Sequence, residues 1–269
     1  MHKIKKLVLP VAGLGKRLRP LTLRTPKALV KLKGRPLLDY VLGEVVETDI
    51  KEVILVTAPT QRKRFLTYVK TAKKRFPGLK FYIRVQDKPL GTGHVLLMAE
   101  DLIKNDYFAV RFCDDLLVNK TPFFRSLIEE ASRLDGSLLT LRRVPKSQVS
   151  RFGVVASRRM KGSGSLYRIS KIVEKPKLKE APSNLVLIGA YVLSPSIMRQ
   201  LRKMDRRLKK GRVNDSLLLT TAFDLDLAEK RKIFGLEFKG QYLDCGTLES
   251  LKEANEVIRR QPSTTSATR

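Results

Sequence analysis

Short apolar runs alternate with amphipathic stretches in the first half of the chain. The apolar runs predict buried strands, and stretches with helical spacing of apolar residues predict helices. The predicted strands are 6–11, 52–57, 79–85, 107–112 and 137–141, and the predicted helices are 37–46, 61–75, 94–103 and 122–134. Strands that alternate with helices favour an α/β fold, with a mainly parallel sheet and helices on both faces.

The pattern changes after residue 144. Segments 153–156, 166–173 and 186–193 read as strands without helices between them, and Gly162 and Gly164 indicate a turn. These strands are expected to extend the same sheet. Helices are then predicted at 196–208, 215–229 and 248–260, with a strand at 233–238. We expect one domain over residues 1–260, and a disordered Ser/Thr-rich tail over 261–269.

Composition narrows the class of protein. The chain has 269 residues, 42% of them hydrophobic, which is enough for a sizeable core. No apolar run approaches the roughly 18 residues of a membrane helix, and the apolar stretch near the N-terminus is short for a signal peptide. We therefore expect a cytoplasmic protein without a membrane partner. Two cysteines exclude a disulfide framework and a four-cysteine zinc site.

The charge is strongly basic. Lys and Arg total 55 against 26 Asp and Glu, a formal net charge of +29, and residues 1–38 contain no acid. A second basic cluster runs from Arg199 to Arg212. Such a surplus attracts polyanions. Because the bases are spread along the chain with few aromatics among them, a solvated basic surface is the simpler interpretation, with at most weak, nonspecific nucleic-acid binding.

A glycine loop follows the first predicted strand. Gly13 and Gly15 allow the backbone to present N–H groups to phosphates, and Arg17 adds positive charge directly after them. Lys27 follows within the same basic segment, placed to meet the same phosphates. The loop lacks the G-K-[ST] ending of a Walker loop and the third glycine of a dinucleotide fingerprint. It therefore predicts a phosphate site of another type.

A second loop, Q-D-K-P-L-G-T-G-H over 86–94, joins a predicted strand to a predicted helix. The amide of Gln86 offers a donor and an acceptor, enough to read a pyrimidine edge. Gly91 and Gly93 let the backbone approach a flat ring. For His94 the sequence leaves a structural role and a ligand contact open.

Two aspartates each close a strand-like run. Asp114 ends F-A-V-R-F-C-D, and Asp244 ends the run Y-L-D. Residues at strand ends lie at the carboxyl edge of an α/β sheet, where ligands bind. Carboxylates suit hard cations, so both side chains are candidate Mg²⁺ ligands at one site. A helix N-cap is the structural alternative for Asp244.

A further run, I-V-E-K-P over 172–176, follows F-G-V-V over 152–155. The carboxylate of Glu174 can accept hydrogen bonds from sugar hydroxyls, and Lys175 can meet a sugar phosphate. Taken alone, E-K-P reads as a surface turn.

Together these runs resemble the nucleoside-triphosphate-dependent sugar nucleotidyltransferases. G-x-G-x-R-x-x-P-x-T followed by P-K is similar to the signature of that family, and E-K-P after F-G-V is typical of it. The P-L-G-x-G-H form resembles the bacterial UTP–glucose-1-phosphate uridylyltransferases more than the thymidylyltransferases. The resemblance covers the chain from Lys6 to about Ile258.

The resemblance implies a Rossmann-like nucleotidyltransferase fold with a nucleotide-binding half over about 1–144 and a sugar-binding half over 145–260. It implies transfer of a uridylyl group from UTP to glucose 1-phosphate, with Mg²⁺ as cofactor, in a homo-oligomer. The implied sites are catalytic Arg17, Lys27 and Lys175; nucleotide-binding Ala12, Gly13, Gly15, Gln86 and Gly91; sugar-binding Gly153, Glu174 and Lys175; and metal-binding Asp114 and Asp244.

Three departures from the family pattern leave alternatives open. Cys113 stands where glycine is common, Ala28 stands where the family has Glu or Gln near the base, and G-R-V-N-D-S over 211–216 replaces an acidic segment. Base selectivity is therefore left open. A thymidylyltransferase, a uridylyltransferase for another sugar 1-phosphate, and an inactive basic nucleic-acid-binding or regulatory protein on this fold remain as alternatives.

Overall fold

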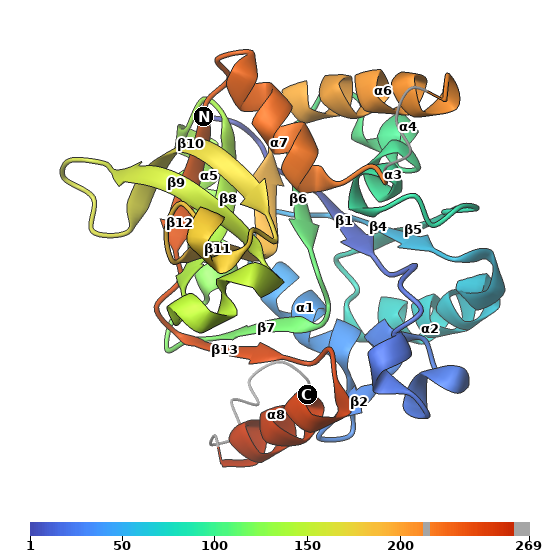
Figure 1. Cartoon of the computed structure of the whole chain (residues 1–269). Helices are drawn as coiled ribbons and strands as arrows, with labels where there is room; N and C mark the ends of the chain where they lie inside the picture. The colour runs from blue at the N-terminus through green and yellow to red at the C-terminus, as the bar shows by residue number, and fades with distance from the viewer. Residues whose placement is uncertain (212–215, 261–269) are drawn as a thin grey trace.

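A nine-stranded mixed sheet forms the centre of the computed structural model, which describes residues 1–211 and 216–260 (Figure 1). Its strands, in chain order, are β1 (Lys6–Pro10), β4 (Glu52–Thr57), β5 (Lys80–Val85), β6 (Phe108–Arg111), β8 (Ser137–Arg143), β9 (Gly153–Arg159), β10 (Leu166–Glu174), β11 (Leu185–Leu193) and β12 (Ile233–Glu237). Their order across the sheet is β5-β4-β1-β6-β11-β8-β12-β10-β9. The expected Rossmann-like α/β fold with a mixed sheet is confirmed.

The four strands β5, β4, β1 and β6 are parallel. Parallel neighbours need a crossover, and helices α1 (Leu37–Val45) and α2 (Arg62–Arg75) supply the first two. The third crossover contains α3 (Thr92–Leu97) and α4 (Glu100–Ile103). The single helix predicted over 94–103 is therefore wrong: the helix breaks at Met98 and Ala99. Ala99 and Ile103 are both fully buried, so the apolar spacing expected of a single helix continues across the break.

Antiparallel pairing is concentrated in the second half of the chain. Strand β11 runs antiparallel to β6, β8 and β9, and all nine of its residues are buried. The predicted turn between β9 and β10 is confirmed, with Gly162 at φ +74°. Strand β11 therefore joins the parallel part of the sheet to the hairpin that carries the predicted sugar residues. The division into halves near residue 144 stays a prediction.

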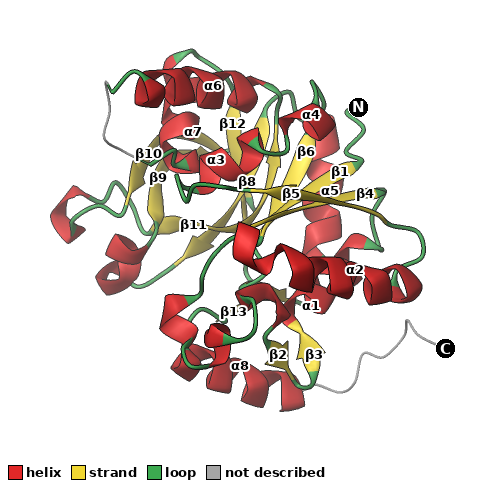
Figure 2. Cartoon of the chain, turned by 90° about the vertical axis from the view of Figure 1, so that its right-hand side faces the viewer, coloured by secondary structure: helices red, strands yellow, loops and turns green. Residues whose placement is uncertain are grey.

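Helices cover both faces of the sheet (Figure 2). Alternation along β1 sends Leu7 and Leu9 to one face and Val8 to the other, as the pleat requires. The first face packs against α1, α2 and α5 (Phe123–Arg133). The second face packs against α3, α4, α6 (Ser196–Lys209) and α7 (Leu219–Ala228). Among the described helices, none is long and apolar enough to cross a membrane.

A small layer lies at the carboxyl edge of the sheet, which we define as the edge where β1, β4, β5 and β6 end. Here β7 (Asp115–Val118) pairs antiparallel with β13 (Gln241–Asp244), beside helix α8 (Leu248–Arg260) and the short strands β2 (Lys31–Leu32) and β3 (Arg35–Pro36). A third apolar cluster, which includes Leu18, Leu116 and Leu251, holds this layer together.

Two predictions fall partly or wholly outside the described residues. The helix predicted over 215–229 begins at Leu219 within the described residues, and its predicted first residue, 215, lies outside them. The tail predicted over 261–269 lies wholly outside the described residues.

Candidate active site

Three carboxylates gather where β6 leaves the sheet. The chain turns through Cys113 and Asp114 into β7, whose first residue, Asp115, is paired in register with Asp244 of β13. The Cys245 N–H donates a hydrogen bond of 2.7 Å to the Asp114 carbonyl oxygen, which ties the two turns together. One oxygen from each of Asp114, Asp115 and Asp244 lies within 4.8 Å of the others. The structure thus brings the two predicted metal aspartates together.

Asp115 is the member of this cluster to which the sequence assigned no role. Its carboxylate accepts a hydrogen bond of 2.9 Å from the Gly189 N–H and one of 2.6 Å from the Tyr242 hydroxyl. Burial, together with the neighbouring Asp114 carboxylate, raises the pKa of Asp115 to about 6. Because its oxygens are bound to strands β11 and β13, Asp115 anchors the turn that presents Asp114.

Cations from the basic N-terminal segment reach the carboxylates. Lys27 forms an ion pair with Asp114 through Nζ and Oδ2. The Arg17 guanidinium lies against Gly246, where an added Cβ would stand 3.1 Å from Nη2 of Arg17 and 2.7 Å from Oδ1 of Asp244. The turn after Asp244 therefore has no room for a side chain. Two of the predicted catalytic residues thus lie beside the two predicted metal aspartates.

The glycine loop folds back onto the same lysine. Gly15 has φ +59°, in the left-handed region, and a Cβ there would lie 2.9 Å from Thr22 and 3.1 Å from Cβ of Lys27. The Thr22 hydroxyl donates a hydrogen bond of 2.8 Å to the Gly15 carbonyl oxygen. Gly13 is exposed, with open space around it, and Ala12 is half-buried. The loop is therefore exposed to solvent at Gly13 and tightly packed against Thr22 and Lys27 at Gly15.

The predicted base-reading loop follows β5. The amide nitrogen of buried Gln86 donates a hydrogen bond of 3.1 Å to the Gly91 carbonyl oxygen and lies 3.2 Å from Nδ1 of His94. Gly91 has φ +101°, and a Cβ there would meet the Leu217 carbonyl oxygen at 2.8 Å. The structure therefore places His94 as a buried partner of Gln86, and the amide oxygen of Gln86 has no hydrogen-bond partner among the described residues.

The predicted sugar residues form a separate group on the β9–β10 hairpin. Glu174 is paired in register with Gly153, and the Lys175 N–H donates a hydrogen bond of 3.0 Å to the Phe152 carbonyl oxygen. A Cβ on Gly153 would lie 3.0 Å from Thr220 and 3.4 Å from Glu174. Lys175 is exposed, and its Nζ lies 3.8 Å from Glu174. Within the described ranges, the ion pairs of Lys175 do not reach the aspartate cluster.

Strand β11 connects these two groups. Burial raises the pKa of the Tyr191 hydroxyl, and the carboxylates of Asp115 and Glu174 both raise it further. Both carboxylates are therefore close enough to act on one phenol. The sugar residues and the aspartates thus border the same central strand.

Arg111 was missed by the sequence analysis. It is fully buried, pairs with Glu44 at 3.1 Å, and donates hydrogen bonds to the carbonyl oxygens of Phe112, Asp115 and Gly189. A buried guanidinium needs such partners, because an unpaired buried charge is very costly. It thereby fixes the turn that carries the aspartates. A single arginine in the apolar run 108–112 was the signal that could have identified it.

A cavity of about 430 Å³ is present elsewhere in the molecule, whereas a smaller one of about 210 Å³ adjoins Asp244. The smaller cavity is lined by Arg142, Arg151 and Tyr242, among others, and Arg151 lies 3.6 Å from Asp244. It offers room and positive charge next to the carboxylates. The carboxylate oxygens themselves fit a hard divalent cation.

The chain belongs to the nucleotidyl transferase family, whose sequence profile matches residues 5–261. It is 30% identical to the UTP–glucose-1-phosphate uridylyltransferase of Bacillus subtilis (91% of this chain, 88% of that one) and 31% identical to that of Staphylococcus epidermidis (97% and 95%). The names of these relatives specify one reaction, whereas the family description specifies only nucleotidyl transfer.

Solved structures agree with this assignment. A UDP-glucose pyrophosphorylase complexed with UDP-glucose superposes with a TM-score of 0.84 at 28% identity, covering 97% of this chain and 100% of that one. A UTP-bound UGPase from Acinetobacter baumannii has a TM-score of 0.82 at 28% identity, with coverage of 97% and 95%. A putative glucose-1-phosphate thymidylyltransferase from Bacillus anthracis, at 24% identity, shares the fold.

Proposed function

We propose that the chain transfers the uridylyl group of UTP to glucose 1-phosphate, giving UDP-glucose and pyrophosphate. The observation that carries the proposal is the convergence of Asp114, Asp244, Lys27 and Arg17 at the carboxyl edge of the sheet. Relatives that cover nearly the whole chain carry this activity in their names. Cytoplasmic location, homo-oligomerisation and the nucleotide and sugar halves belong to the same proposal.

Mg²⁺ is the cation we assign to Asp114 and Asp244. When bound, Mg²⁺ neutralises and orients phosphate oxygens, which the many basic side chains cannot do alone. Lys27 forms an ion pair with Asp114. Its ammonium group is therefore placed to bind triphosphate oxygens beside the same carboxylate. Arg17, next to Gly246, is the second cation for the triphosphate.

The sugar phosphate is the nucleophile. One of its oxygens attacks the α-phosphorus of UTP in line, and the bond from that phosphorus to the pyrophosphate leaving group breaks. Lys175 binds the sugar phosphate, Glu174 accepts hydrogen bonds from sugar hydroxyls, and Gly153 contacts the sugar through its backbone. These residues position two anions against each other, and no covalent enzyme intermediate is required.

Base recognition depends on the orientation of the Gln86 amide. Its nitrogen is engaged by the Gly91 carbonyl oxygen and by His94, which leaves its oxygen as the acceptor for the N3–H of uracil. Thymine carries the same N3–H, so this contact does not separate the two bases. Ala28 is buried and offers no polar group. Preference for UTP must therefore arise at the ribose or at the C5 position of the base.

A substrate panel tests the proposal. Pyrophosphate release is measured with UTP and dTTP, each combined with glucose, galactose and N-acetylglucosamine 1-phosphates. We expect the highest kcat/KM for UTP with glucose 1-phosphate, by about tenfold or more over dTTP. Equal or better turnover with dTTP would replace the uridylyl assignment by the thymidylyl one. Absence of release with every pair would favour the inactive, nucleic-acid-binding alternative.

A further inference from the structure

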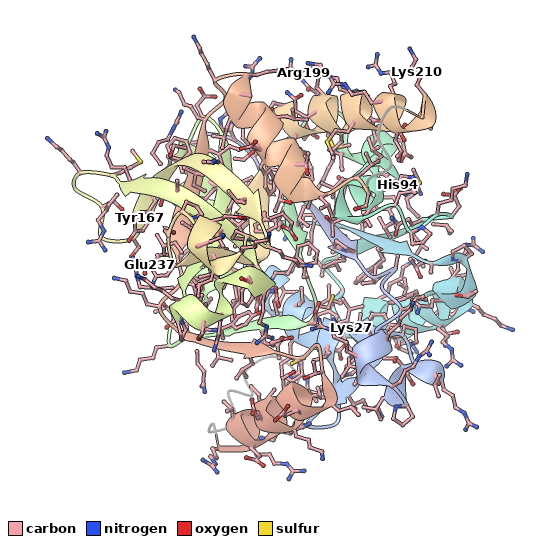
Figure 3. All side chains as sticks on the ribbon, in the orientation of Figure 1. Lys27, His94, Tyr167, Arg199, Lys210 and Glu237 are labelled. Carbon is pink, nitrogen blue, oxygen red and sulfur yellow. The ribbon has the colours of Figure 1, made fainter. Side chains whose placement is uncertain are left out.

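The larger cavity lies at the opposite edge of the sheet from the candidate active site. Tyr107 directly precedes β6, Gly136 precedes β8, Lys232 precedes β12, and Ser194 follows the antiparallel β11, and all four line this cavity of about 430 Å³. We call this the amino edge. At about 3.3 Å per extended residue, the stretch from Tyr107 to Phe112, just before the turn to Asp114, spans about 17 Å. Figure 3 shows Arg199, at the amino edge, far from Lys27.

The cavity is strongly positive. Its lining contains one acidic side chain, Asp135, and five basic ones: Arg199, Arg202, Lys230, Arg231 and Lys232. Three of the five have acidic partners, since Arg199 lies 4.0 Å from Glu229, Lys232 lies 3.5 Å from Asp135, and Arg202 pairs with Glu100.

The remaining two basic residues, Lys230 and Arg231, are exposed and have no ion pair within the described part of the chain. Even when every paired acid is counted, positive charge exceeds negative charge around the cavity. The basic residues that produce this excess come from two separate segments, helix α6 and the turn between α7 and β12.

One buried hydrogen-bond donor in the cavity wall also lacks an acceptor. Nε of Arg199 is buried, and no described atom accepts a hydrogen bond from it, which is uncommon for a buried donor. Helix α6 starts at Ser196, and no side chain caps its N-terminus. Its dipole therefore adds positive potential at the cavity. The hydroxyls of Ser194 and Ser196 lie 2.7 Å apart at the same place, and the Ser196 hydroxyl donates a hydrogen bond of 2.6 Å to the buried Asp226 carboxylate.

We propose that this cavity is a second ligand site, which binds a compact oligophosphate such as inorganic tripolyphosphate or the triphosphate group of a nucleotide. The basic groups surround a single solvent-open cavity, which suits a small, densely charged anion. Tyr107 is the aromatic residue of the lining, and its ring already stacks on His2 at 3.9 Å. This arrangement is unlike the free stacking surfaces that single-stranded nucleic acid requires.

The test uses the full chain, magnesium-free buffer and inorganic tripolyphosphate as the probe. Affinity is measured by calorimetry, and the bound position is located by hydrogen exchange of backbone amides. The double variant Lys230→Gln, Arg231→Gln removes two exposed cations from the cavity. The matched control, Lys73→Gln with Lys74→Gln, removes two exposed cations from α2, which lies away from α6 (Figure 1).

We expect tripolyphosphate to protect amides in segments 104–108, 193–199 and 229–233. The cavity variant should bind at least tenfold more weakly at that position, and the α2 control should bind like the wild type. Protection confined to the carboxyl edge, or equal affinity in all three proteins, would overturn the proposal. Duplex or single-stranded nucleic acid that outcompetes tripolyphosphate and protects α2 as well as α6 would replace it with a nucleic-acid surface.

Discussion

The two edges of the central sheet use charge in opposite ways. At the carboxyl edge, three carboxylates gather and basic groups are held against them, as Lys27 is against Asp114 and Arg151 against Asp244. At the amino edge, the cavity has five basic side chains and one acidic one. The basic residues behind the net charge of +29 are therefore paired with acids at the carboxyl edge and outnumber acids at the amino edge.

The two edges are suited to different tasks. Opposed charges at fixed positions can orient a triphosphate and a metal ion, which is what nucleotidyl transfer requires. An excess of positive charge, with one buried donor left unpaired, attracts an anion but supplies no group arranged to react with it. We therefore expect substitutions at the carboxyl edge to change turnover, and equivalent substitutions at the amino edge to change binding alone.

The largest effect should come from the aspartate pair. Asp114→Asn and Asp244→Asn keep side-chain size and remove charge, so each should lower turnover about a hundredfold, the scale of losing one strong electrostatic element. The double variant should lose little more, because both carboxylates serve one ion. The measurement is turnover against magnesium concentration.

Asp135→Asn is the matched control for the aspartate pair, since it removes an exposed acid from the amino edge. It should retain turnover within about twofold. Thermal stability should change little in all of these variants. The metal assignment fails if either Asp114→Asn or Asp244→Asn keeps near wild-type turnover and magnesium dependence.

A smaller effect is expected from Arg111, which positions the aspartate turn without touching substrate. Arg111→Leu removes the donor to three carbonyl oxygens and leaves Glu44 without its cation. Stability should fall by about 3 kcal/mol, as for other broken buried pairs. Turnover should fall about tenfold, with a higher magnesium concentration at half-maximal rate.

The magnesium dependence of turnover distinguishes a positioning role for Arg111 from a purely structural one. Arg111→Lys keeps the charge and loses the planar fork of donors, so it should lie between wild type and Arg111→Leu in magnesium dependence. If both variants lose stability while their magnesium dependence stays that of the wild type, Arg111 supports the fold alone.

Much of the fold could be predicted because its signals are local. Strand β4 and helix α8 have the predicted bounds, since each is one uninterrupted pattern. The meeting of Asp114 and Asp244 was expected because both close strand-like runs. The structure brings them together by another route, since Asp244 ends β13, which pairs with β7 outside the nine-stranded sheet. The roles assigned to the site residues stay predictions.

What could not be predicted depends on contacts between distant segments. Strands β7 and β13 have four residues each, too few for a periodic signal, and their pairing places Asp115 next to Asp244. The partners of Arg111 come from α1, β7 and β11. The basic cluster from Arg199 to Arg212 was visible in the sequence, but the meeting of its Arg199 and Arg202 with Lys230 and Arg231 at one cavity requires the tertiary fold.

The two cysteines should matter less than Arg111, although each adjoins a metal aspartate. Both are free and buried, in different apolar clusters, and burial raises the pKa of each thiol to about 12. Cys113→Ala and Cys245→Ala should each keep turnover within about threefold, with a stability loss of about 1 kcal/mol from the lost packing. Inactivation of both, with unchanged circular dichroism and melting behaviour, would contradict this expectation.

The smallest change in turnover is expected from a variant at the amino edge. Lys230→Gln with Arg231→Gln should leave turnover, without added oligophosphate, within about twofold of wild type at 0.15 M salt. The Debye length there is about 8 Å, well below the separation of about 17 Å along β6 between the edges, so the aspartate cluster should scarcely sense the change. At 0.01 M salt the Debye length is about 30 Å, and KM for the anionic substrates should rise by about twofold. The α2 control variant, Lys73→Gln with Lys74→Gln, removes the same charge and should show a similar rise. A tenfold loss of turnover at 0.15 M salt in the cavity variant alone would mean that the amino edge takes part in catalysis, and the contrast between the two edges would be wrong.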